Sequence, residues 1–235
     1  MDAVRVFLAK GGDPNAKDPH NRRSLLSWVA GQGDTIMTRL LLEQNADIHA
    51  VDNHKQNALF WAAQNSQVAF TRLLLEAGAN VDGLDNDGKA PFFAVMSKAC
   101  SEITDIDFQS ANQQNPDGQM CHSVADKQAD ICRLLLEYGA SDHDNEGNSA
   151  YRFALKEGLG DILQIFVEKG VVPINEVDGE GCSLVYRAVR KGHYSAVKVL
   201  VDAGADTVKS DNTEIMTSLH LCEHDDLIGL LYSLR

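Results

Sequence analysis

Short apolar stretches alternate with polar turns along the chain. The segment Leu40-Leu41-Leu42-Glu43 returns 33 residues later as Leu73-Leu74-Leu75-Glu76, and again as Leu134-Leu135-Leu136-Glu137. Two changed copies are Phe166-Val167-Glu168 and Leu200-Val201-Asp202. A fixed period in the apolar pattern indicates a repeat protein, in which each unit completes its core only against its neighbours.

Each repeat contains two apolar stretches with helical character. The first is short and rich in alanine, as in Leu59–Ala63, and the second has helical spacing, as in Val197–Val201. A small residue separates the two at Gly33, Ser66, Gly158 and Gly192. Neither helix is long enough to be stable alone, so the pattern predicts an all-α stack of helix pairs.

The residues that open the units mark the boundaries of one expected domain, residues 1–235. Polar turns such as Asp85-Asn86-Asp87-Gly88 stand at these openings and use glycine to reach a positive φ. The expected units are a partial repeat 1–18, then 19–51, 52–84, 85–143, 144–177, 178–211, and a C-terminal capping repeat 212–235.

The pattern resembles the ankyrin repeat, in about six to seven drifted copies including partial ones. The segment Thr217-Ser218-Leu219-His220 comes close to the Thr-Pro-Leu-His signature of that family, and Gly204-Ala205-Asp206 matches its tail motif. The resemblance implies an all-α solenoid of helix–turn–helix units with short β-hairpin or loop fingers. It also implies a module that binds proteins.

The third unit and the N-terminus depart from the regular pattern. In the third unit the first helix is expected to end near Lys98 and the second to begin near Lys127, so residues 99–126 form an insert with acidic residues and no Lys or Arg before Lys127. Ile103, Ile106 and Phe108 could form an apolar anchor there. A surface loop and a specific contact element are both open. Residues 1–18 supply only half a repeat, which fits either a cut through a longer array or an unusual cap.

Charge and cysteine content restrict the classes of binding partner and the cellular compartment that we expect. The formal net charge of −13 disfavours nucleic acid and anionic lipid. The five cysteines are odd in number and widely spaced, which argues against a disulfide framework. No apolar run reaches the length of a membrane span, and no signal peptide opens the chain. We expect a cytoplasmic monomer, with the nucleus or a host cytosol as alternatives.

Few residues suggest chemistry. Cys100, Cys121, His122 and Cys132 raise a zinc hypothesis, but no C-x₂-C pair is present, so we expect no metal site and no cofactor. The resemblance gives His193 a capping role and His220 a hydrogen-bonding role between repeats. No phosphate loop, nucleophile elbow or H-E-x-x-H motif occurs, and we expect no catalytic residue.

The resemblance places partner binding on the concave face, which is made by the finger tips and by exposed positions of the first helices. Mapped onto this chain, the expected partner-binding residues are His20, Asn21, Arg23, Asn53, His54, Gln56, Gln64, Asn65, Asn86, Asp87, Lys89, Lys98, Asn145, Glu146, Asn148, Lys156, Arg190 and Lys191. Trp28 and Trp61 stand 33 residues apart, and we assign them to packing rather than to binding.

Two functions are compatible with these features. The first is an adaptor or scaffold that recognises a folded surface or an extended peptide. The second is the targeting or regulatory arm of a larger enzyme or of a bacterial effector acting in a host cell. The basic residues Arg152, Lys156, Arg187, Arg190 and Lys191 fit either an acidic peptide or a solvated face.

Overall fold

The computed structural model describes residues 2–105, 124–143, 149–179 and 181–206. They belong to two compact units, Met1–Gly147 and Asn148–Arg235, and each unit is described by itself. The first unit holds α1 (Asp2–Ala9), α2 (Leu25–Gln32), α3 (Thr35–Glu43), α4 (Ala58–Gln64), α5 (Val68–Glu76), α6 (Pro91–Asp105) and α7 (Val124–Glu137). The second holds α8 (Ala150–Glu157), α9 (Gly160–Glu168), α10 (Leu184–Arg190) and α11 (Tyr194–Asp202).

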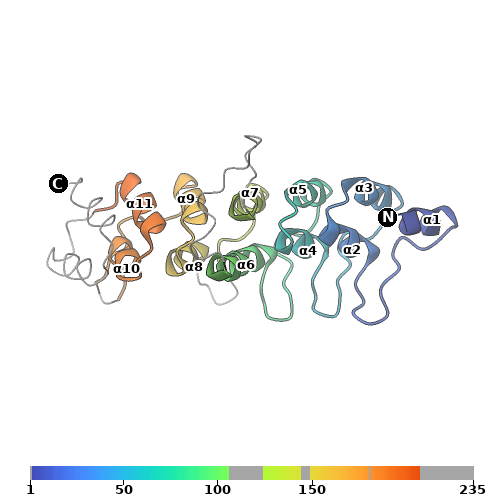
Figure 1. Ribbon diagram of the computed structural model, residues 1–235, viewed down its shortest axis with the longest axis horizontal. Helices are drawn as coiled ribbons and strands as arrows, with labels where there is room; N and C mark the ends of the chain where they lie inside the picture. Colours follow the sequence, from blue (N-terminus) through green and yellow to red (C-terminus); the bar gives the residue numbers. More distant parts are fainter. Residues whose placement is uncertain (1, 106–123, 144–148, 180, 207–235) are drawn as a thin grey trace. The chain divides into compact units, whose positions relative to one another are not determined.

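The first unit is a stack of helix pairs. Helices α2, α4 and α6 contact one another in sequence and form a first row, while α3, α5 and α7 form a second row behind them (Figure 1). Long loops, here called fingers, project on the side of the first row. This arrangement confirms the predicted all-α solenoid. Isolated antiparallel bridges join Lys17 to Ser24 and Val177 to Ser183.

Local sequence explains where the paired helices begin and separate. The side chain of Ser24 accepts a hydrogen bond from the backbone N–H of Ser27 at 3.1 Å, and that of Asn57 accepts one from Phe60 at 2.9 Å. One residue takes a positive φ between α2 and α3, at Gly33 (74°), and one between α4 and α5, at Ser66 (56°). The breaks predicted at these positions, and at Gly158 and Gly192, are therefore confirmed.

The repeated tail motif builds the core. Its second apolar residue is completely buried in every described copy, at Leu41, Leu74, Leu135, Phe166 and Leu200. Two buried threonines on the second helices, Thr38 and Thr71, each donate a hydrogen bond to the backbone carbonyl four residues earlier. Apolar contact between neighbouring repeats stabilises the stack. The two buried hydroxyl groups are hydrogen-bonded and so carry no desolvation penalty for an unpaired donor.

Helix α6 is longer than the sequence pattern predicts. It runs to Asp105, so the expected end near Lys98 is wrong, and α7 already begins at Val124. The cause lies at Ala99, which occupies the position held by Gly33 and Ser66 in earlier repeats. Alanine favours helix continuation, whereas the two earlier residues take a positive φ. Ile106 and Phe108 of the insert lie outside the described residues.

The second unit repeats the same plan with two helix pairs. Helix α8 packs on α9 and on α10, and α11 packs on α10 and α9. The imidazole Nε2 of His193 lies 2.9 Å from the carbonyl oxygen of Lys156 and donates a hydrogen bond to it, because a carbonyl can only accept. His193 therefore caps the C-terminal end of α8 from the neighbouring repeat.

Candidate partner-binding surface

Each of the first three fingers is closed by a buried or half-buried aspartate. One carboxylate oxygen of Asp52 accepts hydrogen bonds from the backbone N–H groups of His54 (2.8 Å) and Gln56 (3.0 Å). Asp85 does the same in the next finger. In the first finger a proline, Pro19, stands at the equivalent position, and Asp18 supplies the carboxylate from one residue earlier. The hydrogen bond from Asn21 lowers the pKa of Asp18.

The fingers are also tied to one another. The backbone N–H of Asn53 donates to Asn21 at 2.9 Å, and that of Asn86 donates to His54 at the same distance. The side-chain amides of Asn53 and Asn86 donate to the preceding finger as well, at 3.0 and 2.9 Å. Three successive fingers are thus linked by both backbone and side chain, which gives the tips a fixed spacing before any partner arrives.

Arg23 stacks between the two tryptophans of the first row. Its guanidinium carbon lies 3.6 Å from the ring centroid of Trp61 and 4.7 Å from that of Trp28. The Trp61 indole N–H donates to Asp52 at 3.0 Å, and an Arg23 N–H donates to the carbonyl of Ser27 at 2.7 Å. Burial lowers the pKa of Arg23, and the Asp52 carboxylate opposes that shift. Charge attraction and cation–π stacking therefore hold this cluster together.

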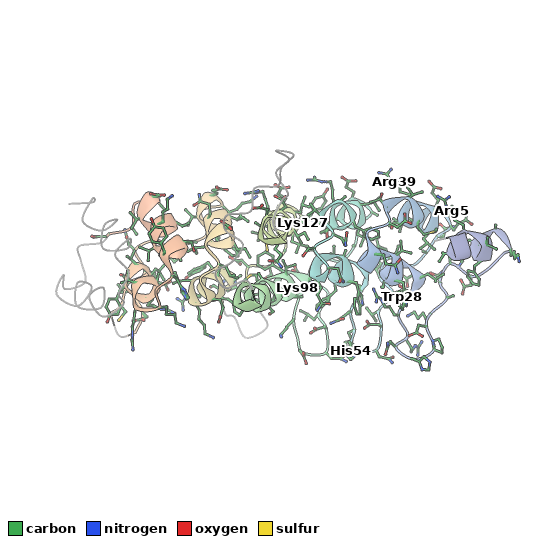
Figure 2. The ribbon with its side chains drawn as sticks, viewed as in Figure 1. Arg5, Trp28, Arg39, His54, Lys98 and Lys127 are labelled. Atoms are coloured by element: carbon green, nitrogen blue, oxygen red, sulfur yellow. The ribbon has the colours of Figure 1, made fainter. Side chains whose placement is uncertain are left out.

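A hollow of about 260 Å³ opens beside this cluster. It is lined by Asp18, Asn21, Arg23, Trp28, Asp52, His54 and Trp61. Trp28 keeps 47% of its surface exposed, whereas Asp52 keeps only 6%. Figure 2 shows Trp28 and His54 on the first-row side of the unit and Arg39 on the second-row side. The hollow thus presents an accessible aromatic ring on a rigid rim.

A second hollow of about 340 Å³ lies one repeat further along. It is lined by Gln56, Phe60, Gln64, Asp85, Asp87, Lys89, Ala94, Ser97 and Lys98. The side chain of Gln56 donates to Asp85 at 3.5 Å across the two repeats. This hollow is more polar than the first, and most of its rim can form hydrogen bonds or ion pairs with a ligand.

The structure brings together many of the residues that the sequence singled out. Asn21, Arg23 and His54 border the first hollow, and Gln56, Gln64, Asp87, Lys89 and Lys98 border the second. His20, Asn53 and Asn86 lie at the tips, where both asparagine amides are already engaged. The amide of Asn65 donates to the carbonyl of Trp61 and so caps its own helix. Asn145, Glu146 and Asn148 lie outside the described residues. Contact with a partner stays a prediction for the whole set.

The two tryptophans, both assigned to packing from the sequence, have different surroundings in the structure. Trp61 stacks on Arg23 and bonds to Asp52, in keeping with packing, whereas Trp28 leaves nearly half of its surface to solvent. Asp18 and Asp52, which line the first hollow, are not among the partner-binding residues predicted from the sequence. No spacing along the chain links Arg23 to Trp61 or Asp52, because repeat stacking alone brings them together.

In the second unit, Lys156, Arg190 and Lys191 are exposed at the ends of the first-row helices α8 and α10. Arg152 is engaged instead. It bonds to the carboxylate of Glu176, which also accepts a hydrogen bond from Tyr151 at 2.6 Å. Burial and the bond to Glu176 raise the pKa of Tyr151.

The zinc hypothesis rests on four residues, of which only Cys132 has a described side chain. It is completely buried in α7 among apolar residues, and burial raises the pKa of its thiol. The side chains of Cys100, Cys121 and His122 lie outside the described part, as does all of His220. Within that part, no cluster of His, Cys, Asp and Glu is arranged to hold a metal ion.

A family profile described as "Ankyrin repeats (3 copies)" matches residues 1–85 and 120–211. The chain belongs to the ankyrin-repeat family. Ankyrin repeats are generally protein–protein interaction modules, and the repeat itself is a non-catalytic fold. None of the helices in the described ranges combines the length and apolar character that crossing a membrane requires.

Curated relatives match parts of this chain, and the matched segments cover less than two thirds of each relative's own length. The chain is 31% identical over 112 residues to the nuclear factor NF-kappa-B p105 subunit of Gallus gallus, covering 46% of this chain and 11% of that protein. It is 38% identical over 88 residues to the p105 subunit of Rattus norvegicus, covering 36% and 9%. A putative ankyrin repeat protein of Rickettsia bellii (strain RML369-C) is 34% identical over 108 residues, covering 43% of this chain and 59% of that protein.

Proposed function

We propose that this chain is a non-catalytic adaptor that binds a partner protein on the face formed by the finger tips and the first-row helices. The observation that carries this proposal is the hollow in which Trp28 is 47% exposed beside three linked fingers. Tryptophan is favoured among the residues that dominate binding energy at interfaces. A rim that is already ordered loses little conformational entropy when it binds.

Replacement of Trp28 tests this function. We expect Trp28→Ala to weaken capture of the natural partner from native lysate at least about tenfold, the size of effect typical of an interface anchor. The matched control is Ile36→Ala on α3, which removes an even more exposed apolar side chain (65%) from the second row. Quantitative mass spectrometry of the captured proteins measures both effects. Equal capture by both variants, with unchanged melting temperatures, would contradict the proposal.

A second function is supported by the coverage of the relatives. The matched segments make up 11% of the Gallus gallus p105 subunit and 9% of the Rattus norvegicus p105 subunit. Ankyrin repeats of this kind therefore occur as parts of longer proteins. We propose as an alternative that this chain is the targeting arm of a larger enzyme or of an effector that acts in a host cell. An immunoblot of the natural source gives the size of the native protein, and a band near 25.7 kDa would contradict it.

Cysteine chemistry supports a reducing compartment, the cytoplasm. The five cysteines, Cys132 and Cys182 among them, are odd in number and widely spaced, which argues against a disulfide framework. Disulfides are rare in the cytosol and common in secreted proteins. Recovery of both residues as alkylated thiols from cells quenched with iodoacetamide supports this compartment.

A further inference from the structure

Charged side chains in the second unit are segregated by helix row. The segments that contain α8 and α10, residues 149–158 and 183–193, carry five Lys or Arg residues and a single acid, Glu157. The cations are Arg152, Lys156, Arg187, Arg190 and Lys191. The second-row helices α9 and α11 carry three acids, Asp161, Glu168 and Asp202, and one cation, Lys198. The first row is therefore positive within a chain whose net charge is −13.

Helical geometry places three of these cations together. Arg187, Arg190 and Lys191 are spaced i, i+3 and i+4, so they share one side of α10 over about 6 Å of helix length. The opposite side packs into the core through Leu184, Val185, Ala188 and Val189. Lys156 occupies the position of Arg190 one repeat earlier, on the neighbouring helix α8. Packed helices lie about 8–10 Å apart, so Lys156 extends the same cationic surface.

The charges of this surface are poorly compensated. Arg152 is paired with Glu176, and Lys156 lies 3.3 Å from the carboxylate of Glu157. Arg187, Arg190 and Lys191 form no ion pair with any residue that the structure describes. Three like charges within one helical turn repel one another, which disfavours the helix unless a counter-charge is supplied.

The fold itself does not require these cations. A positive charge near a helix C-terminus is favourable, but α2 and α4 have no basic residue in the last turn and still form first-row helices of the same kind. The positions of Arg190 and Lys191 hold Gln64 and Asn65 in α4. The cationic surface is therefore specific to this unit rather than a property of the repeat.

We propose that Arg187 and Arg190 of α10, Lys191 at its C-cap and Lys156 of α8 bind an acidic peptide segment of a partner protein. The proposal rests on the adaptor function and adds the chemistry of the ligand. Two Asp or Glu carboxylates can pair with two arginine guanidinium groups, which bind carboxylates in a bidentate manner. A peptide is favoured over nucleic acid because ankyrin repeats are generally protein–protein interaction modules. Nucleic acid is the competing ligand in the experiment below.

Fluorescence anisotropy with defined probes tests this surface in the full chain. The probe is a labelled twelve-residue peptide of alternating Glu and Gly, compared with the same peptide carrying Gln and with a labelled twelve-nucleotide oligothymidylate. The Glu peptide should bind, and the Gln peptide should bind at least about tenfold more weakly. Equal affinity for the Glu and Gln peptides, or tighter binding of the oligothymidylate, overturns the proposal.

Two variants with the same change in net charge distinguish an effect of the cationic surface from an effect of the net charge of the chain. R190E/K191E should weaken binding of the Glu peptide at least about tenfold. K169E/K198E changes the net charge by the same amount as R190E/K191E, at two exposed residues outside the cationic surface. This variant should keep most of the affinity for the Glu peptide. Equal loss in both variants, with unchanged melting temperatures, overturns the proposal. A negative result in the peptide-binding experiment does not affect the capture experiment with Trp28 in the first unit. The acidic-peptide proposal and the adaptor proposal can therefore be refuted independently.

Discussion

At the scale of single residues, the finger turns show a conformational requirement that the sequence only partly reveals. The turn residue has a positive φ in every described finger, at Arg22 (55°), Lys55 (61°), Gly88 (73°) and Gly181 (79°). Glycine adopts this conformation at little cost, whereas a residue with a Cβ is disfavoured by about 1–2 kcal/mol. The first two fingers therefore retain strain that the later ones avoid.

Lys55→Gly should stabilise the first unit by about 0.5–1 kcal/mol, because it removes the strained Cβ at the cost of some unfolded-state entropy. The measurement is urea unfolding followed by circular dichroism. Lys55→Ala serves as the control, because it removes the same side chain and keeps the Cβ. A gain from Lys55→Ala as large as that from Lys55→Gly would refute the conformational explanation.

The sequence predicts the finger-turn residues of the candidate site but not the cluster around Arg23, because that cluster forms only when repeats stack. Asn21 and His54 are polar residues of recognisable finger turns, so their place at the rim of a hollow follows from the repeat register. The stacking of Arg23 between Trp28 and Trp61 depends on the approach of two helices and a finger from neighbouring repeats. Such a cluster has no signature in the local pattern.

At the scale of helices and turns, the sequence predicts most of the fold because helix breaks are encoded locally. The small residues at Gly33, Ser66, Gly158 and Gly192 all take a positive φ and separate the helices of a pair. Ala99 occupies the same position in the third unit and has no such effect, so α6 continues to Asp105. The end predicted near Lys98 follows the usual repeat length, which holds only where a residue of positive φ ends the first helix.

Gly158 both ends helix α8 and lies against His193 of the next repeat. A Cβ at this position would lie 2.6 Å from Nδ1 of His193, whose Nε2 bonds to the carbonyl of Lys156. Gly158→Ala should therefore reduce the free energy of unfolding by about 1–2 kcal/mol for its positive φ and by about 1–2 kcal/mol more for the displaced histidine.

Gly170→Ala is the matched control for this prediction. Gly170 has a similar φ of 71°, yet a Cβ there meets nothing within 4 Å. Chemical denaturation should show a clearly larger loss for Gly158→Ala than for Gly170→Ala. Losses of the same size would mean that the histidine contact contributes nothing to stability.

At the scale of the whole molecule, the two units keep the same scaffold and carry different surface chemistry. The position of Trp28 in α2 and Trp61 in α4 is occupied by Phe153 in α8 and by Arg187 in α10. An aromatic hollow and a cationic surface thus arise from one repeat plan. Repeat proteins permit this divergence because exposed first-row residues do not contribute to the core, so they vary while buried positions such as Leu41 and Leu200 stay apolar.

Site-specific photo-crosslinking tests the proposed partner-binding face most directly. A benzophenone amino acid is introduced at His54, on the finger side of the first unit, or at Arg39, on the second-row side (Figure 2). Both residues are exposed, so neither replacement disturbs the core. We expect the captured partner to crosslink from position 54 and not from position 39. Crosslinking from position 39 alone would contradict it.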